Sequence, residues 1–360
     1  MDTYFIQRGA LPYTGKALEN KKLTIGFLGG SITEQAEGDH WPEAVVNWFV
    51  ETYPAVRITS ENAAVGATGS DLAAFRVERD ILSRKCDLIF VEYAVNDLGL
   101  STDIRTQSRE GLVRKLLRHA AADVVFVYTF SQPMAEYFAK GQLPPSIAEF
   151  EQLAEHYQIS SVQMGLYAFE LVRRGRMRWE EWLPDGLHPH FRGSLSYGEA
   201  VISFLKTALA CPDAPAKARA LPAPFHPGNW ENCRLLPFDA LTLRGPWKIQ
   251  RSTNSVWADH YLETCSIDAE LEFEFTGRAC LLFFDFGKLA GDYQYKIDGS
   301  DWTTDLRERP DWCRDFGWLR GTCLLHEAIA QRHHVVLRNV CGKSPDCKST
   351  NFRLAYLGIV

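Results

Sequence analysis

Four short segments in the first half of the chain combine residue types that can do chemistry. The first is Gly29-Gly30-Ser31-Ile32-Thr33, which directly follows the apolar run at residues 23–28. Two glycines let the backbone turn sharply and present a hydroxyl, so Ser31 is a candidate nucleophile. The spacing is not that of the G-x-S-x-G elbow, because position 33 is threonine. A phosphate loop and a plain turn are therefore alternatives.

Two further segments offer N–H donors to a developing negative charge. Gly66, in the loop at residues 62–71, can aim its backbone N–H at an oxyanion with no side chain in the way. Asn96, in the segment 91–97, can present its side-chain amide to the same oxyanion. Taken alone, Gly66 is explained more simply by a turn, and Asn96 by a turn asparagine that bonds its own backbone.

The fourth segment, at residues 183–190, places Asp185 three residues before His188. A carboxylate at this spacing can accept a hydrogen bond from one ring nitrogen and leave the other facing the serine, which fixes the tautomer of a general base. The alternatives are a structural His188, a solvent-facing His190, or a metal bound by Asp185, His188 and His190. We expect no metal, because the sequence has no further ligand cluster at suitable spacing.

Alternating apolar and amphipathic runs must position these four segments. Strands that are apolar throughout and separated by helices predict a parallel sheet covered on both faces, that is, a three-layer α/β domain. Each of the four segments then lies at the carboxyl edge of the sheet, where open α/β sheets place their sites. We expect strands at 23–28, 56–59, 87–92, 124–128 and 159–163, and helices at 43–53, 72–82, 104–119, 147–157 and 193–209.

The second half of the chain differs in texture. Residues 211–228 contain five prolines and five alanines, which favours an extended connector. Beyond it, short alternating segments and turn residues such as Asp298-Gly299 and 344–346 predict an antiparallel β-sandwich, resembling a jelly roll. We therefore expect an α/β domain at 1–210, a linker at 211–228 and an all-β domain at 229–360. The expected strands are 270–275, 279–284, 293–297, 334–337 and 352–360.

Composition excludes several classes of function. The chain has 360 residues, 46% of them hydrophobic, and a net charge of −6 with scattered basic residues. Disordered chains are excluded, and neither nucleic acid nor an anionic membrane is expected as a partner. The N-terminus lacks the apolar run of a secretion signal, and the nine cysteines are an odd number in a large chain, so we expect reduced thiols and a cytoplasmic location.

The four segments, in this order and near these separations, resemble the four blocks of the SGNH (GDSL-like) hydrolase superfamily over residues 22–210. The resemblance implies a flavodoxin-like α/β/α fold with Ser31 as nucleophile, His188 as base and Asp185 as its orienting carboxylate. It also implies an oxyanion hole made of the N–H groups of Ser31 and Gly66 and the Asn96 side chain. No cofactor is required for this chemistry.

Two positions depart from the family pattern. Gly30 stands where many members have aspartate, and Ala94 stands where many have the glycine of a GxND block. Neither change removes a reacting group, so we expect activity to be kept. Loop shape and substrate preference are the properties that these positions can alter.

The second domain bears on the substrate. Trp230, Trp247, Trp257, Trp302, Trp312 and Trp318 follow the expected linker and can either stack on sugar rings or, more simply, fill a sandwich core. A hydrolase domain followed by such a module looks like carbohydrate-active acetylesterases, so we expect a serine esterase acting on acetylated carbohydrate. The alternatives are a carbohydrate- or ligand-binding protein that uses the hydrolase fold as a scaffold, and a short-chain lipolytic enzyme or thioesterase.

Overall fold

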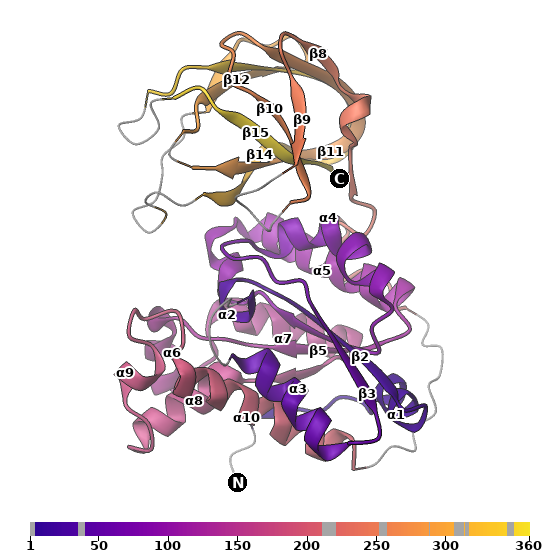
Figure 1. The fold of residues 1–360 in the computed structure, drawn as a ribbon, viewed down its shortest axis with the longest axis vertical. Helices are drawn as coiled ribbons and strands as arrows, with labels where there is room; N and C mark the ends of the chain where they lie inside the picture. Colours follow the sequence, from indigo (N-terminus) through magenta and orange to yellow (C-terminus); the bar gives the residue numbers. More distant parts are fainter. Residues whose placement is uncertain are drawn as a thin grey trace. The chain divides into compact units, whose positions relative to one another are not determined.

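The computed structural model of the chain divides into two units, Met1–Glu231 and Asn232–Val360. It describes residues 4–34, 40–210, 221–251, 258–287, 289–305, 313, 317–343 and 349–360. The first unit is a three-layer α/β domain and the second is an antiparallel all-β domain (Figure 1). The predicted fold class is therefore confirmed. Among the described helices, none combines the length and the apolarity needed to cross a membrane.

Parallel strands in the order β3-β2-β4-β5-β6 form the sheet of the first unit, and β1 pairs with β6 in the antiparallel direction at one edge. This parallel order is the flavodoxin-like arrangement. Strands β4 and β5 are buried throughout, because helices cover both faces of a parallel sheet. The strands are β1 (Phe5–Ile6), β2 (Lys22–Gly29), β3 (Arg57–Asn62), β4 (Leu88–Glu92), β5 (Asp123–Val127) and β6 (Ser160–Val162).

The covering helices pack in two groups. Helices α3 and α10 contact each other on one face of the sheet, and α4 and α5 contact each other on the opposite face (Figure 1). For every predicted strand and helix of this domain, both ends lie within three residues of the ends of an observed element. The described helices are α1 (Pro12–Glu19), α2 (Ser31–Glu34), α3 (Trp41–Thr52), α4 (Ser70–Asp80), α5 (Thr102–His119), α6 (Ala135–Ala139), α7 (Pro145–Tyr157), α8 (Met164–Arg173), α9 (Trp179–Trp182) and α10 (Phe191–Ala208).

The strands of the second unit pair in the order β13-β12-β14-β11-β15-β10-β9, while β7 pairs with β15 and β8 with β11. The expected strands 270–275 and 279–284 form one long strand, because β11 continues through a register shift between Gly277 and Ala279. The described strands are β7 (Arg234–Leu235), β8 (Thr242–Arg244), β9 (Lys248–Arg251), β10 (His260–Thr264), β11 (Glu270–Phe286), β12 (Asp292–Ile297), β13 (Thr303–Asp305), β14 (Trp318–Val340) and β15 (Phe352–Ile359).

The turn at Asp298-Gly299 joins β12 to β13. Both residues have positive φ values, 53° and 77°, which is the type I′ geometry that matches the twist of a hairpin. The second expected turn, at 344–346, lies outside the described residues, and so do Trp257, Trp312 and residues 211–220 of the expected linker.

The described part of that linker, residues 221–228, is held on the first unit. Arg114 of α5 donates to the Pro222 carbonyl, and the buried Glu110 carboxylate accepts backbone N–H groups from two residues of the segment. Trp230, which follows, is buried beside α5. The proline-rich composition indicated an extended segment, but it could not show that helix α5 offers polar partners for its backbone.

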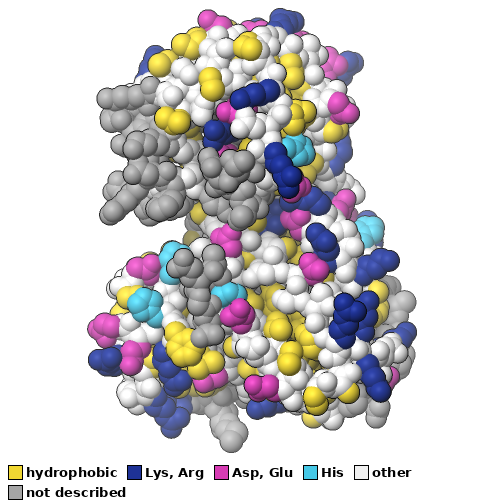
Figure 2. Space-filling model, in the orientation of Figure 1, with side chains coloured by type: hydrophobic (Ala, Val, Ile, Leu, Met, Phe, Trp, Pro, Cys, Tyr) yellow, Lys and Arg dark blue, Asp and Glu magenta, His cyan; other side chains and the backbone are white. Residues whose placement is uncertain are grey.

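Acidic and basic side chains are interspersed over the face of the molecule drawn in Figure 2. The chain carries 45 acidic and 39 basic residues. A mixed surface of this kind has no large field of one sign on the visible face.

Candidate active site

Ser31 begins the short helix α2, directly after strand β2. The carbonyl of Gly30 accepts the N–H groups of Thr33 and Glu34, which closes the turn that presents the serine at the carboxyl edge of the sheet. A side chain at position 30 would overlap the amide of Asn96. The absence of aspartate at this position therefore has a local reason, because it lets the Asn96 amide lie against the loop that carries the serine.

The structure brings Ser31, His188 and Asp185 into one hydrogen-bonded chain. The Ser31 hydroxyl lies 2.9 Å from His188 Nε2, and His188 Nδ1 lies 2.8 Å from Asp185 Oδ2. A carboxylate accepts, so Nδ1 carries the proton and Nε2 is left as the acceptor for the serine hydroxyl. This is the tautomer that a general base needs in order to take a proton from serine.

A local turn fixes Asp185. Its Oδ1 accepts the backbone N–H groups of Leu187 and His188 at 2.9 and 2.7 Å, while Oδ2 faces the imidazole. Partial burial works to raise the pKa of Asp185, but the hydrogen bonds from the side chain and backbone of His188 outweigh it, and the pKa lies below its usual value. Asp185 is therefore ionised at neutral pH.

Gly66 lies beside Ser31. A Cβ on Gly66 would be 3.5 Å from Ser31 Cβ, so the two residues are neighbours. The loop is held by the hydrogen bond from Val65 N–H to the Gly29 carbonyl, and Ala67 adopts a left-handed φ of 57° that few residues with a Cβ take. In this structure the Gly66 N–H donates to Glu34 Oε2 at 2.8 Å.

Asn96 is placed by the residue after it. The Asp97 carboxylate is buried, accepts the Ser70 N–H at 2.7 Å and pairs with the buried Arg109 guanidinium at 2.6 Å. These contacts join the turn that carries Asn96 to the first turn of α4 and to the middle of α5. Asn96 lies against Gly30 and Gly66 lies beside Ser31, so the structure brings these residues together at one edge of the sheet. That they form an oxyanion hole stays a prediction.

Glu92, the last residue of β4, lies beneath the serine loop. Its carboxyl oxygens are 2.6 Å from the Thr129 hydroxyl and 3.0 Å from the Thr33 hydroxyl. The side chain is fully buried, and this burial raises the pKa of Glu92 to about 7. Glu92 therefore connects the ends of β4 and β5 to the turn that presents Ser31.

Sequence reasoning missed Glu92, Glu34 and Arg109. A carboxylate at the end of a strand that is otherwise apolar is the signal that could have identified Glu92. Glu34 follows the serine by three residues, but its contact with Gly66 joins two distant loops. Arg109 is one of many charged residues in α5, and its burial is visible only in three dimensions.

The alternatives named from the sequence for this edge were a solvent-facing His190 and a metal site. His190 is exposed at the start of α10. Within the described residues, no group of three or more His, Cys, Asp and Glu side chains is arranged to hold a metal ion.

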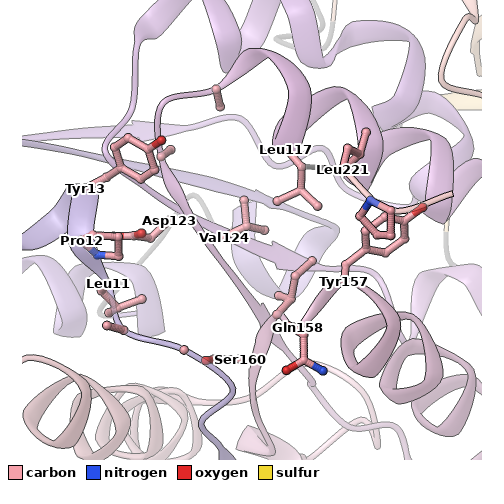
Figure 3. A pocket seen from close by; sticks show the side chains of 16 residues that line it. Leu11, Pro12, Tyr13, Leu117, Asp123, Val124, Tyr157, Gln158, Ser160 and Leu221 are labelled. Carbon is pink, nitrogen blue, oxygen red and sulfur yellow. The ribbon is translucent and has the colours of Figure 1, made fainter. Parts of the chain in front are cut away.

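A cavity of about 200 Å³ lies at the other edge of the sheet, where β5 and β6 begin (Figure 3). Asp123 lines it, but its carboxylate already accepts the N–H and hydroxyl of Thr14 at 2.8 and 2.7 Å. Parallel strands place their beginnings and ends at opposite edges, so this cavity is separate from the Ser31 site.

The arrangement around Ser31 can perform acyl transfer. It combines a hydroxyl bonded to an imidazole, a carboxylate that orients the imidazole, and the Gly66 loop beside the serine. These are the parts that nucleophilic attack on an ester carbonyl requires.

Comparison with known proteins agrees with this arrangement. Residues 27–194 match the model of the GDSL-like Lipase/Acylhydrolase family. Two solved structures are of a two-domain esterase active on acetylated mannans, one of them co-crystallised with mannopentaose. Each is 22% identical to this chain and covers 99% of it. The chain in turn covers 97% and 96% of those chains, with TM-scores of 0.84 and 0.83. At this identity the likeness establishes the fold. No curated protein matches the chain in sequence.

Proposed function

Because residues 27–194 belong to the GDSL-like lipase/acylhydrolase family, we propose that the protein is a serine esterase that removes short acyl groups, most simply acetyl, from a carbohydrate. The observation that carries the proposal is the chain of hydrogen bonds from Ser31 through His188 to Asp185. No cofactor takes part in the proposed reaction.

The reaction proceeds in two halves. His188 Nε2 takes the proton of Ser31 as its Oγ forms a bond to the ester carbonyl carbon, and the carbonyl oxygen becomes an oxyanion. The N–H groups of Ser31 and Gly66 and the side chain of Asn96 donate to it, and each such donor contributes ~3 to 4 kcal/mol to transition-state stabilisation. The alcohol leaves with the proton from His188, and a water activated by His188 then releases the acid.

Asp185 acts through the imidazole. Its ionised carboxylate holds the Nδ1 proton and stabilises the imidazolium that forms during each half. The lowered pKa of Asp185 supports this role, since the carboxylate stays charged across the range in which the base works.

The likeness over both units supports the choice of an acetylated carbohydrate as substrate. The two similar structures are of an esterase active on acetylated mannans, and the likeness spans nearly the whole of each chain. A scaffold for ligand binding alone would not require the hydrogen-bonded Ser31, His188 and Asp185. Long-chain lipids are disfavoured because no exposed amphipathic lid is evident in the sequence.

An ester panel tests the proposal. Purified protein is incubated with p-nitrophenyl esters of increasing chain length and with acetylated oligosaccharides, and release of acid is measured. We expect turnover of acetyl esters that falls as the acyl chain lengthens, and we expect it to disappear in Ser31→Ala. An intact, folded protein that hydrolyses none of these esters would favour the binding function.

We also propose that the first unit folds alone if the cut follows Glu231 rather than Ala210. The contacts of Arg114 and Glu110 with residues 221–228, and the burial of Trp230, support this boundary. A chain ending at 231 should keep activity on a small acetyl ester, whereas one ending at 210 should be less soluble.

The expected cytoplasmic location stays a prediction, which cell fractionation tests.

A further inference from the structure

The Glu34 carboxylate accepts a hydrogen bond from the Gly66 N–H, which the proposed reaction needs as an oxyanion donor. Its Oε2 accepts the Gly66 N–H at 2.8 Å, and a Cβ on Gly66 would lie 2.6 Å from the same oxygen. Glu34 is the last residue of α2, one helical turn after Ser31, so its side chain can return to the loop beside the serine. The carboxylate therefore lies between the α2 turn and the Gly66 loop.

A carboxylate at this N–H competes with an ester oxyanion. One backbone N–H makes one strong hydrogen bond, and an oxyanion that shared this donor would place a second negative charge within a few ångströms of the first. The resting contact must consequently break before Gly66 can stabilise a transition state. Because hydrogen bonds to a charged group are among the stronger ones, breaking it without replacement slows the reaction.

We propose that Glu34 is a specificity-determining residue, which holds the oxyanion site closed against esters that offer its carboxylate no hydrogen-bond donor. A substrate with free hydroxyl groups beside the ester gives the displaced carboxylate new donors and so offsets the lost bond to Gly66. An ester without such hydroxyls does not. This inference rests on the proposed esterase function and refines its substrate to partly acetylated sugars.

Other hydrogen bonds hold the Ser31 turn and the Gly66 loop together independently of the Glu34 carboxylate. The Asn62 side-chain amide donates to the Thr33 carbonyl at 2.8 Å, and Val65 N–H donates to the Gly29 carbonyl at 3.0 Å. Neither bond involves the Glu34 side chain. Displacement of Glu34 can therefore free the Gly66 N–H without moving the backbone that carries it.

The test compares Glu34→Ala with the wild-type protein on two sugar esters that differ in free hydroxyls. Glucose pentaacetate has none, whereas a monoacetylated glucose has several beside the ester. We expect Glu34→Ala to raise kcat/KM about tenfold for the pentaacetate and to lower it for the monoacetylated sugar. Glu34→Gln, which keeps an acceptor but loses the charge, should lie between the two proteins. Labelling of Ser31 by a fluorophosphonate, which carries no hydroxyl, should quicken about tenfold in Glu34→Ala.

Glu51→Ala is the matched control, because it removes an exposed carboxylate from the last turn of α3. It should leave both kcat/KM values unchanged. The inference is overturned if Glu34→Ala changes both sugar esters in the same direction, or changes neither. A wild-type protein that hydrolyses neither ester removes the proposed function and this inference together, whereas an active wild type with an unchanged preference in Glu34→Ala removes only the inference.

Discussion

The two sides of the candidate site are held in different ways. Ser31 rests on buried polar groups from several elements, with Glu92 of β4 below it and the Asp97–Arg109 pair behind Asn96. The segment that carries His188 and Asp185 is exposed: the two side chains retain 42% and 53% of their accessible surface. Its hydrogen bonds are mostly local, within residues 183–190.

Because of this difference, the two sides of the site should contribute differently to the free energy of unfolding and to the reaction rate. Groups beneath Ser31 contribute to both, because their removal leaves buried polar partners without hydrogen bonds. The His188 loop contributes mainly to reactivity, since water can replace contacts that are already half exposed. Substitutions on the two sides should therefore differ in unfolding free energy even where they affect the rate alike.

The largest effect is expected at the nucleophile. Ser31→Ala should lower the rate of acetyl ester hydrolysis at least ~10³-fold, because no other group can form the acyl bond. The melting temperature should stay within a few degrees of the wild type, since the hydroxyl is a small group at a strand end. Initial rates with p-nitrophenyl acetate and a thermal scan measure both quantities. Residual turnover near the wild-type rate would exclude Ser31 as nucleophile.

Asp185→Asn tests the exposed side. The amide can donate to Nδ1 and so favours the wrong tautomer of His188, and the rate should fall ~10²- to 10⁴-fold. Because the Asp185 side chain is half exposed, we expect little change in thermal stability. A large drop in melting temperature, measured by circular dichroism, would show that this loop is as structural as the serine side.

Arg109→Leu tests the buried side. It leaves the Asp97 carboxylate buried without its cation, which typically costs ~3 to 5 kcal/mol of unfolding free energy. Urea titration of the transition of the first unit measures this loss. Adding Asp97→Asn to the same chain removes the unpaired charge and should recover part of it. A single variant as stable as the wild type would contradict the contrast drawn between the two sides.

Glu92→Gln should change how stability depends on pH. The pKa of Glu92 is raised from 4.5 to about 7 in the folded protein, so the folded state binds the proton more tightly than the unfolded state does. The protonated Glu92 side chain therefore contributes to the free energy of unfolding below pH 4.5, and this contribution is lost as the pH rises through about 7. The loss is at most ~3 kcal/mol. Unfolding titrations from pH 5 to 8 should show a smaller decline in the variant. Equal slopes in the two proteins would indicate that Glu92 is ionised at all these values.

Much of the α/β domain was evident in the sequence because its signals are local. Apolar runs and helical spacing placed each predicted element near its observed position. The predicted helices at 43–53, 72–82 and 104–119 each begin two residues after the observed start. In the second and third, the missed first turn holds polar residues that do not follow the apolar period, whereas the first helix begins with the buried Trp41 and Pro42. Short elements such as α6 and α9 gave too few residues to establish a period.

In the second unit, pairing rather than local pattern decided the strands. The long strand β14 was predicted only at 334–337, because its exposed middle section does not alternate in the way a half-buried strand does. Its partner β11 was predicted as two strands, 270–275 and 279–284, because the alternating pattern is interrupted where the register shifts between Gly277 and Ala279. Such strands are held by their neighbours, so their extent depends on contacts far apart in the chain.

For the candidate site, the sequence by itself determined the residue types. Ser31, Gly66, Asn96, Asp185 and His188 follow from four short segments and their order, because each lies at a strand end or in a loop that the local pattern identifies. Only the tertiary structure decided what surrounds them: that Glu92 is buried under the serine, that Arg109 neutralises Asp97, and that Glu34 reaches Gly66. Burial and charge pairing depend on which elements meet in space, and no local pattern records that.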